Sequence, residues 1–357
     1  MRRILGILTA TTAIAAVLAP ATAPSATAAP GRAAVDVFLA DGATPVGSTV
    51  LHPGDKLVVK GRGFDPAANT SGFPLPVPPG VPHGTFIAFG AFAPHWKPSA
   101  GAPEAARATA RSGVQWAMAP SALNRVPTAP FDFRRTIRQQ WVPLHANGTF
   151  TAKLTLSTPK SIPANARWGV YTYGGAGSDN PAQELRIPVR YSTAPGPNTP
   201  APPRRNLIWA YTPSFYRTVT GAAEGTVAGS DGATVDKAGR MSFELRSGSL
   251  RGGTGVLRFH GTVVAYTRFH LYEVALADPV LRVRGGHGVL SMRTSTTNMN
   301  GTDRLRRIDI ADIDLRGAGA DGKRAARVAF RPGISPEVLA LLSTGTAAPL
   351  DLRLSAG

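Results

Sequence analysis

The sequence has 357 residues, in which 39 lysines and arginines face 21 aspartates and glutamates, so the formal net charge is +18. It contains no cysteine, which excludes disulfides, thiolate catalysis, cysteine zinc sites and cysteine-ligated iron–sulfur clusters. The 39 glycines, the 32 prolines and the low aromatic content of 7% are typical of many turns between short strands, and they predict a mainly β protein.

The positive charge is spread along the chain and forms no run of five or more basic residues. A nucleic-acid-binding surface usually shows a clustered basic patch, so we expect no nucleic-acid partner. Attraction of the protein to an anionic cell envelope is the expected consequence of this charge.

Residues 1–29 have the pattern of a secretion signal. Arg2 and Arg3 form the charged start, residues 4–18 are apolar or small, and residues 26–29 provide small-residue cleavage sites. The apolar run is shorter than the about 20 residues of a membrane span. We therefore expect a secreted, extracellular protein with no transmembrane segment in the mature chain, and cell-wall association is a further expectation.

Residues 30–192 are predicted to form a β-sandwich domain of immunoglobulin type. Strand patterns bounded by turn residues occur at 35–39, 56–64, 84–92, 149–156, 168–173 and 185–191. The long insertion at 93–140 includes a predicted short helix at 102–110. We expect the insertion to be ordered, because its tryptophans need packing partners.

Residues 193–205 form a linker with five prolines between positions 194 and 203, which predicts an extended, semi-rigid spacer. The second domain, 206–357, is predicted to be a larger β-sandwich or a flattened barrel with two short helices, at 209–221 and 334–342. Its strand patterns are at 225–229, 241–246, 255–260, 262–276, 280–283, 288–293, 309–315, 327–330 and 350–354.

Sequence patterns for catalysis are missing. There is no nucleophile elbow, zinc-protease motif, phosphate-binding loop or dinucleotide-binding turn, and the seven histidines are dispersed. The densest acidic group is Asp309, Asp312 and Asp314. It lacks the ligand count and glycine of a calcium loop, so we interpret it as a charged strand face near the arginines at 304–307. We predict that the protein is not an enzyme.

Two segments carry a family resemblance. Their shared marks, in chain order, are Trp209, Ser214, Phe215, Gly221, Gly261, Val263, Asp278 and Pro279. With these marks, residues 206–354 resemble the HtaA domain, the secreted haem-binding module of actinobacterial iron acquisition. The resemblance implies a β domain with short helices, a haem cofactor, and haem or a haem-donor protein as partner.

The resemblance also implies two site positions, and both depart from the family pattern. In the family, a tyrosine four residues after the serine ligates the haem iron, and a histidine on the long strand hydrogen-bonds to that tyrosine. These positions are Thr218 and Arg268 in this sequence.

Other residues near these positions are alternative haem-binding candidates. Tyr216 lies two residues before Thr218, about 200° away around a helix, and so faces elsewhere. If 262–276 is one strand, side chains two residues apart share a face, which groups Tyr266, Arg268, His270 and Tyr272. Tyr266, His270 or Tyr272 would then ligate iron, and Arg268 would pair with a propionate. A solvent-facing strand, with Ser214 serving only as a helix cap, is the competing interpretation.

Two functions remain open from the sequence. The first is a non-catalytic cell-envelope protein that binds haem or another flat hydrophobic ligand. The second is a structural or adhesive cell-wall module, built on an HtaA-type scaffold that has lost haem ligation.

Overall fold

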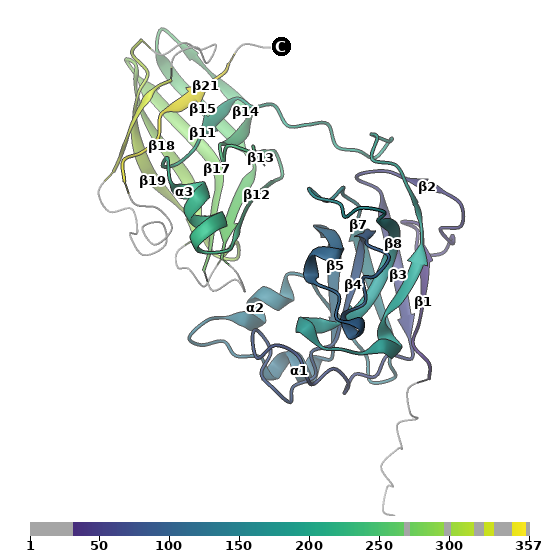
Figure 1. Ribbon diagram of the computed structural model, residues 1–357. Helices are drawn as coiled ribbons and strands as arrows, with labels where there is room; N and C mark the ends of the chain where they lie inside the picture. The colour runs from purple at the N-terminus through teal and green to yellow at the C-terminus, as the bar shows by residue number, and fades with distance from the viewer. Residues whose placement is uncertain (1–30, 268–271, 296–300, 318–324, 332–344, 355–357) are drawn as a thin grey trace, which may run out of the picture.

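The computed structural model describes residues 31–267, 272–295, 301–317, 325–331 and 345–354. The predicted secretion signal at 1–29 and the predicted helix at 334–342 lie outside these residues. The fold is mainly β, as the composition predicts. Its strands form two separate bodies along the chain, joined by an extended segment (Figure 1).

The first body contains the strands β1 to β10. These are β1 (Ala34–Phe38), β2 (Val50–Leu51), β3 (Lys56–Arg62), β4 (Thr85–Phe92), β5 (Arg107–Met118), β6 (Trp141–Pro143), β7 (Phe150–Thr155), β8 (Arg167–Gly174), β9 (Leu185–Pro188) and β10 (Arg190–Tyr191). They pair in the orders β1-β3-β7, β6-β5-β4-β8-β9 and β10-β2.

The core of the first body lies between its two larger sheets. Strands β3 and β7 alternate buried and exposed side chains over much of their length. Leu57, Val59 and Leu154 of this sheet pack in one cluster with Ile87 and Phe89 of the other. Two sheets that share one apolar layer make a sandwich; the more specific immunoglobulin type stays a prediction.

The insertion at 93–140 is ordered, but the helix predicted at 102–110 is wrong. Only a short 3-10 turn, η2 (Glu104–Ala106), precedes the long strand β5. The start of β5 pairs with the end of β4, from Phe92 opposite Arg107 to Gly90 opposite Thr109. Hydrogen bonding to a neighbouring strand therefore overrides the local preference of this alanine-rich segment.

Two helices complete the insertion, α1 (Pro120–Arg125) and α2 (Phe133–Arg138). The tryptophans find the partners that the sequence requires. Trp116 donates to the carbonyl of His83 at 2.6 Å, Trp141 donates to that of Met118 at 2.9 Å, and Trp96 packs edge-on against Tyr171. The remaining short turns are η1 (Pro98–Ala100), η3 (Gly175–Gly177) and η4 (Pro181–Gln183).

The proline-rich linker is only partly a free spacer. Its first half lies against the first body, where Asn198 Nδ2 donates to Asp55 Oδ1 at 2.9 Å and Thr199 Oγ1 donates to the Pro53 carbonyl at 2.6 Å. A side chain at Gly54 would collide with the backbone of Asn198. The stretch without regular structure that leads away from the first body is therefore 200–206.

The second body contains the strands β11 to β21. These are β11 (Leu207–Trp209), β12 (Thr226–Ser230), β13 (Ala233–Val235), β14 (Met241–Arg251), β15 (Thr254–His260), β16 (Thr262–Tyr266), β17 (Glu273–Arg284), β18 (His287–Ser295), β19 (Leu305–Asp314), β20 (Arg327–Phe330) and β21 (Leu350–Leu352). The main order is β20-β19-β18-β17-β15-β14-β11-β21, and β16 pairs with β12 and β17.

This sheet closes on itself almost completely. Ala326, next to β20, exchanges two backbone hydrogen bonds with Leu350 of β21, at 2.8 and 3.1 Å. The two ends of the strand order therefore meet, and the body is a flattened barrel around one apolar core that includes Trp209, Phe215 and Phe243.

The segment predicted as one helix at 209–221 is two elements. Trp209 belongs to strand β11, is buried, and donates its indole N–H to the Ala348 carbonyl at 2.9 Å. The helix starts later, as α3 (Phe215–Arg217), and continues as the π-helical turn η5 (Thr218–Ala222). Between β11 and α3, Tyr211 has a φ of 63°, which is incompatible with a continuous right-handed helix.

Candidate functional site

The start of helix α3 is held by a threonine. Thr212 Oγ1 accepts the backbone N–H of Phe215 at 3.1 Å, whereas Ser214 occupies the N-cap position without a side-chain capping bond. The interpretation of Ser214 as the capping side chain is therefore wrong. Thr212, two residues earlier, supplies the oxygen that the first turn needs.

Helix α3 and the turn η5 that continues it direct Phe215 and Val219 into the core, and both are fully buried. Tyr216 is half-buried and packs against this core and against the turn at Gly239, where a side chain would collide with Tyr216. Thr218 is half-buried on the same helix. A threonine hydroxyl does not ionise as a phenol does, so this position offers no equivalent of a tyrosinate.

The single strand predicted at 262–276 is wrong, because the chain reverses within it. Strands β16 and β17 are antiparallel partners, with Tyr266 opposite Glu273. Thr267 N donates to the Tyr272 carbonyl, and Tyr272 N donates to Thr267 Oγ1, both at 3.0 Å. Tyr266 and Tyr272 therefore belong to two arms of a hairpin, so the two-residue alternation does not run through the segment. Arg268 and His270 lie outside the described residues.

The two hairpin tyrosines meet side chains of the first body. The guanidinium of Arg111 lies 5.1 Å from the ring centroid of Tyr266. The ring of Phe131 meets that of Tyr272 edge-on, with centroids 6.1 Å apart. The structure thus brings two of the predicted site residues together with a surface that sequence patterns did not indicate.

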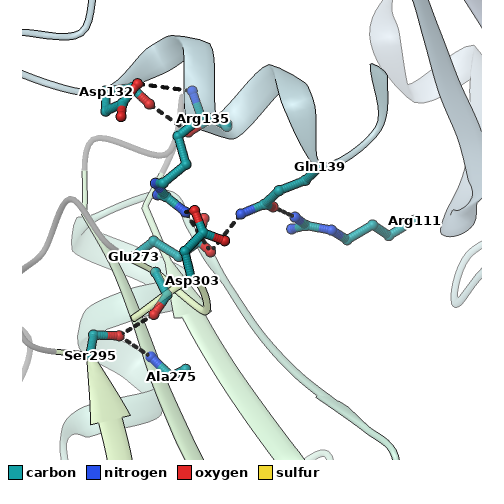
Figure 2. Close-up of polar contacts among 10 residues, drawn as sticks. Arg111, Asp132, Arg135, Gln139, Glu273, Ala275, Ser295 and Asp303 are labelled. Atoms are coloured by element: carbon teal, nitrogen blue, oxygen red, sulfur yellow. Dashed lines mark hydrogen bonds and ion pairs between the residues drawn. The ribbon is translucent and has the colours of Figure 1, made fainter. Parts of the chain in front are cut away.

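Glu273 is the centre of the polar contacts at this junction (Figure 2). Its side chain is 1% exposed, and its Oε1 lies 3.5 Å from Nη1 of Arg135 in α2. Gln139 Nε2 donates to the same oxygen at 3.1 Å. Asp132 caps α2 by accepting the N–H of Arg135 at 2.9 Å, which fixes the turn from which Arg135 extends.

A polar cavity of about 490 Å³ opens beside this pair. Its lining residues are Asp132, Arg135, Arg138, Gln139, Asp303 and Arg304. Nη1 of Arg135 lies 3.8 Å from Asp303 Oδ2. Arginines and carboxylates are nearly balanced here, so the cavity wall is a mixed-charge surface.

Other polar groups form structural contacts. His83 is buried, its Nδ1 lies 2.9 Å from Ser178 Oγ, and burial lowers the pKa of its imidazole below 6.5. Because both residues are fully buried, this pair does not meet a substrate.

The acidic group on β19 forms ion pairs, as expected for a charged strand face. Among the described residues, the partners of Asp309, Asp312 and Asp314 are Arg282, Arg331 and Arg316, and not the arginines at 304–307 that lie nearby in the sequence.

Within the described part of the chain, no three histidine, aspartate or glutamate side chains are grouped to hold a metal ion. No helix among the described residues is long and apolar enough to span a membrane.

Three solved structures similar to this chain come from Corynebacterium glutamicum. The N-terminal domain of HtaA is 20% identical, with a TM-score of 0.34, and the match covers 42% of this chain and 97% of that one. The C-terminal domain of HtaA is 18% identical, with a TM-score of 0.35, and covers 41% and 91%. Heme binding protein HtaB is 16% identical, with a TM-score of 0.31, and covers 41% and 90%. No curated protein matches this chain.

A family model does match the second body. The HtaA model, described as Htaa, aligns with residues 204–331, which contain α3 and the strands from β11 to β20. The match lies where the resemblance of the sequence predicts it. The C-terminal part of this chain, at residues 204–331, is therefore an HtaA domain.

Proposed function

We propose that the protein is a secreted, non-catalytic binding protein of the cell envelope whose HtaA domain serves a haem-related role. The observation that carries this proposal is the family match over residues 204–331. The proposed ligand is haem or another flat hydrophobic molecule, delivered free or by a haem-donor protein.

The residues of helix α3 do not fit the iron ligation that the family resemblance implies. Thr218 stands at the tyrosine position, and Tyr216 packs against the core and the Gly239 turn. We therefore assign no iron-binding step to α3. Tyr266 and Tyr272 are the other candidate phenols in the described residues, and in this arrangement both contact the first body.

Titration of the purified mature chain with hemin tests the proposal. We expect a shifted Soret band that saturates at one hemin per chain. An unchanged hemin spectrum at micromolar protein would contradict haem binding. A Tyr216→Phe variant is the matched control: it removes the phenol oxygen of α3 but keeps the packing of the ring, and its titration should equal that of the parent.

A structural or adhesive module of the cell wall is the second candidate function. The observation that favours it is Thr218 at the expected ligand position, together with the net charge of +18. Such a module would bind isolated cell wall, and added salt would weaken the binding because it screens the attraction between exposed charges. Binding that does not change between low and high salt would argue against this function.

A further inference from the structure

The contact between the two bodies is made by side chains whose positions are fixed on both sides. On the first body, Asp132 caps α2 and thereby sets the direction of Arg135. On the second body, Glu273 begins β17, with Ala265 opposite the adjoining Val274. The Arg135 side chain is 11% exposed and that of Glu273 is 1% exposed. A carboxylate buried this deeply needs compensating contacts, and those of Arg135 and Gln139 come from the first body.

The second body leaves room for the guanidinium that approaches it. Gly301 has a φ of 49° and pairs with Val274, and its carbonyl accepts the hydroxyl of Ser295. A side chain at position 301 would collide with both Glu273 Oε1 and Arg135 Nη1. The absence of a side chain at Gly301 therefore lets Arg135 reach Glu273.

The polar contacts continue to the hairpin tyrosines. Arg111 donates to the side-chain oxygen of Gln139, whose amide donates to Glu273; Figure 2 shows this chain of contacts. The same Arg111 lies over the ring of Tyr266. The side chains that hold the two bodies together thus also cover Tyr266, and Phe131 covers Tyr272.

The junction is polar and open to water through the cavity of about 490 Å³. An ion pair that is buried on docking gains little net free energy, because the desolvation of both charges offsets their attraction, and domains joined by polar contacts are expected to move relative to each other. The stretch at 200–206 has no regular structure to resist such a movement. A docked and an undocked arrangement are therefore expected to exchange.

We propose that the Arg135–Glu273 ion pair stabilises the docked arrangement of the two bodies. In that arrangement the first body covers Tyr266 and Tyr272, so that a ligand cannot reach them. The surface of Arg111, Phe131, Arg135 and Gln139 is then an intramolecular cap for the HtaA domain. The docking is independent of the ligand's identity. Its effect on haem binding rests on the proposed function.

Distance measurements in the full chain test the docking. Because the sequence has no cysteine, spin labels are placed only where they are wanted, at Lys153→Cys on β7 and Lys237→Cys in the turn after β13, both exposed. Double electron–electron resonance should show one narrow distance. Arg135→Glu puts a third carboxylate beside Glu273 and Asp303, and it should broaden the distribution about twofold or more.

Two further variants make the result specific. Gln139→Glu places a carboxylate against Glu273 without changing Arg135, and it should broaden the distribution as well. Arg125→Glu makes the same charge change as Arg135→Glu at an exposed position at the end of α1, outside the lining of the junction cavity, and the distance should stay narrow. A broad distribution in the parent, a narrow one in both Arg135→Glu and Gln139→Glu, or equal broadening in Arg125→Glu would overturn the proposal.

A separate measurement, the affinity for hemin, tests the effect of docking on ligand binding. If docking withholds the tyrosines, Arg135→Glu should bind hemin about threefold to tenfold more tightly than the parent, because the apparent dissociation constant is divided by the competent fraction. Equal affinity in the two proteins would overturn this step. Absence of a Soret shift in both would remove the proposed haem function, while the distance measurements would still decide the docking.

Discussion

At the scale of single residues, the helix of the HtaA domain is placed by packing, and Thr218 stands where the family resemblance implies a tyrosine. Phe215 and Val219 are buried in the core, so the helix is placed by apolar contacts that do not involve position 218. Thr218 is half-buried beside them. A change at this position therefore alters the chemistry of the helix surface more than its placement.

A tyrosine at position 218 directly tests whether this part of the helix can hold haem iron. Thr218→Tyr should give hemin a band typical of tyrosinate-ligated ferric haem and should raise its affinity about tenfold or more, equal to about 1.4 kcal/mol. Absorption spectroscopy during titration measures both effects. Arg217→Tyr, one residue earlier and exposed, is the control that adds the same ring in another direction. The idea fails if the two variants have the same spectrum.

The buried imidazole of His83 should make the first body less stable in acid. Burial lowers the pKa of its imidazole in the folded state below the ordinary 6.5, so the unfolded chain binds the proton more readily. The stability contributed by neutral His83 is then fully present above pH 6.5 and is lost as the pH falls below that value. Thermal unfolding followed from pH 7.5 to pH 5 should show a falling Tm.

The matched variant for this prediction is His83→Gln. Glutamine keeps a polar group near Ser178, the partner of His83 Nδ1, but it does not titrate. Its Tm is expected to start lower and to fall less steeply with acid than that of the parent. Equal slopes in the two proteins would show that other groups cause the acid sensitivity.

At the scale of elements, strand β11 joins the two ends of the barrel. It pairs with β14 on one side and with β21 on the other, and Trp209 lies within it. The indole packs near Tyr211 and Phe330, with ring centroids 5.1 and 6.0 Å away. One side chain therefore contributes to the core and to the closure of the sheet.

Trp209→Ala should destabilise the HtaA domain by about 3–5 kcal/mol, because it leaves a cavity in the core. Trp209→Phe keeps a ring and loses the hydrogen bond to Ala348, so it should cost about 1–2 kcal/mol. Urea unfolding monitored by circular dichroism measures the difference. Since Trp209 is buried in the core of the second body, the unfolding transition of that body should shift and that of the first body should not.

The hairpin of β16 and β17 shows why local patterns were insufficient at this scale. Residues 262–276 include many strand-forming side chains and no glycine or proline, which is compatible with one long strand and with two strands that face each other. In the structure, β16 pairs with β12 on one side and with β17 on the other, and the second pairing places Tyr266 opposite Glu273. In contrast, the pair Asn147–Gly148 is a direct local signal for a turn, and Gly148 adopts a φ of 77° that glycine tolerates best.

At the scale of the whole molecule, the two bodies are attached by more than their linker. The first half of the linker is hydrogen-bonded to the first body, and α2 contacts the HtaA domain from the other direction (Figure 1). These two attachments restrict the arrangement that a free proline-rich spacer would leave open. If the docking holds in solution, the first body controls access to the hairpin end of the barrel.

Local alternation, turn residues and short motifs are sufficient to predict the mainly β composition, most strand positions and the HtaA resemblance of the C-terminal part. The junction between the two bodies is not predictable from such local features. Arg135 and Glu273 are far apart along the chain, and each looks like an ordinary surface charge in its own segment. Their pairing depends on the position of α2, the reversal at the hairpin and the space left by Gly301, and none of these is a property of nearby residues.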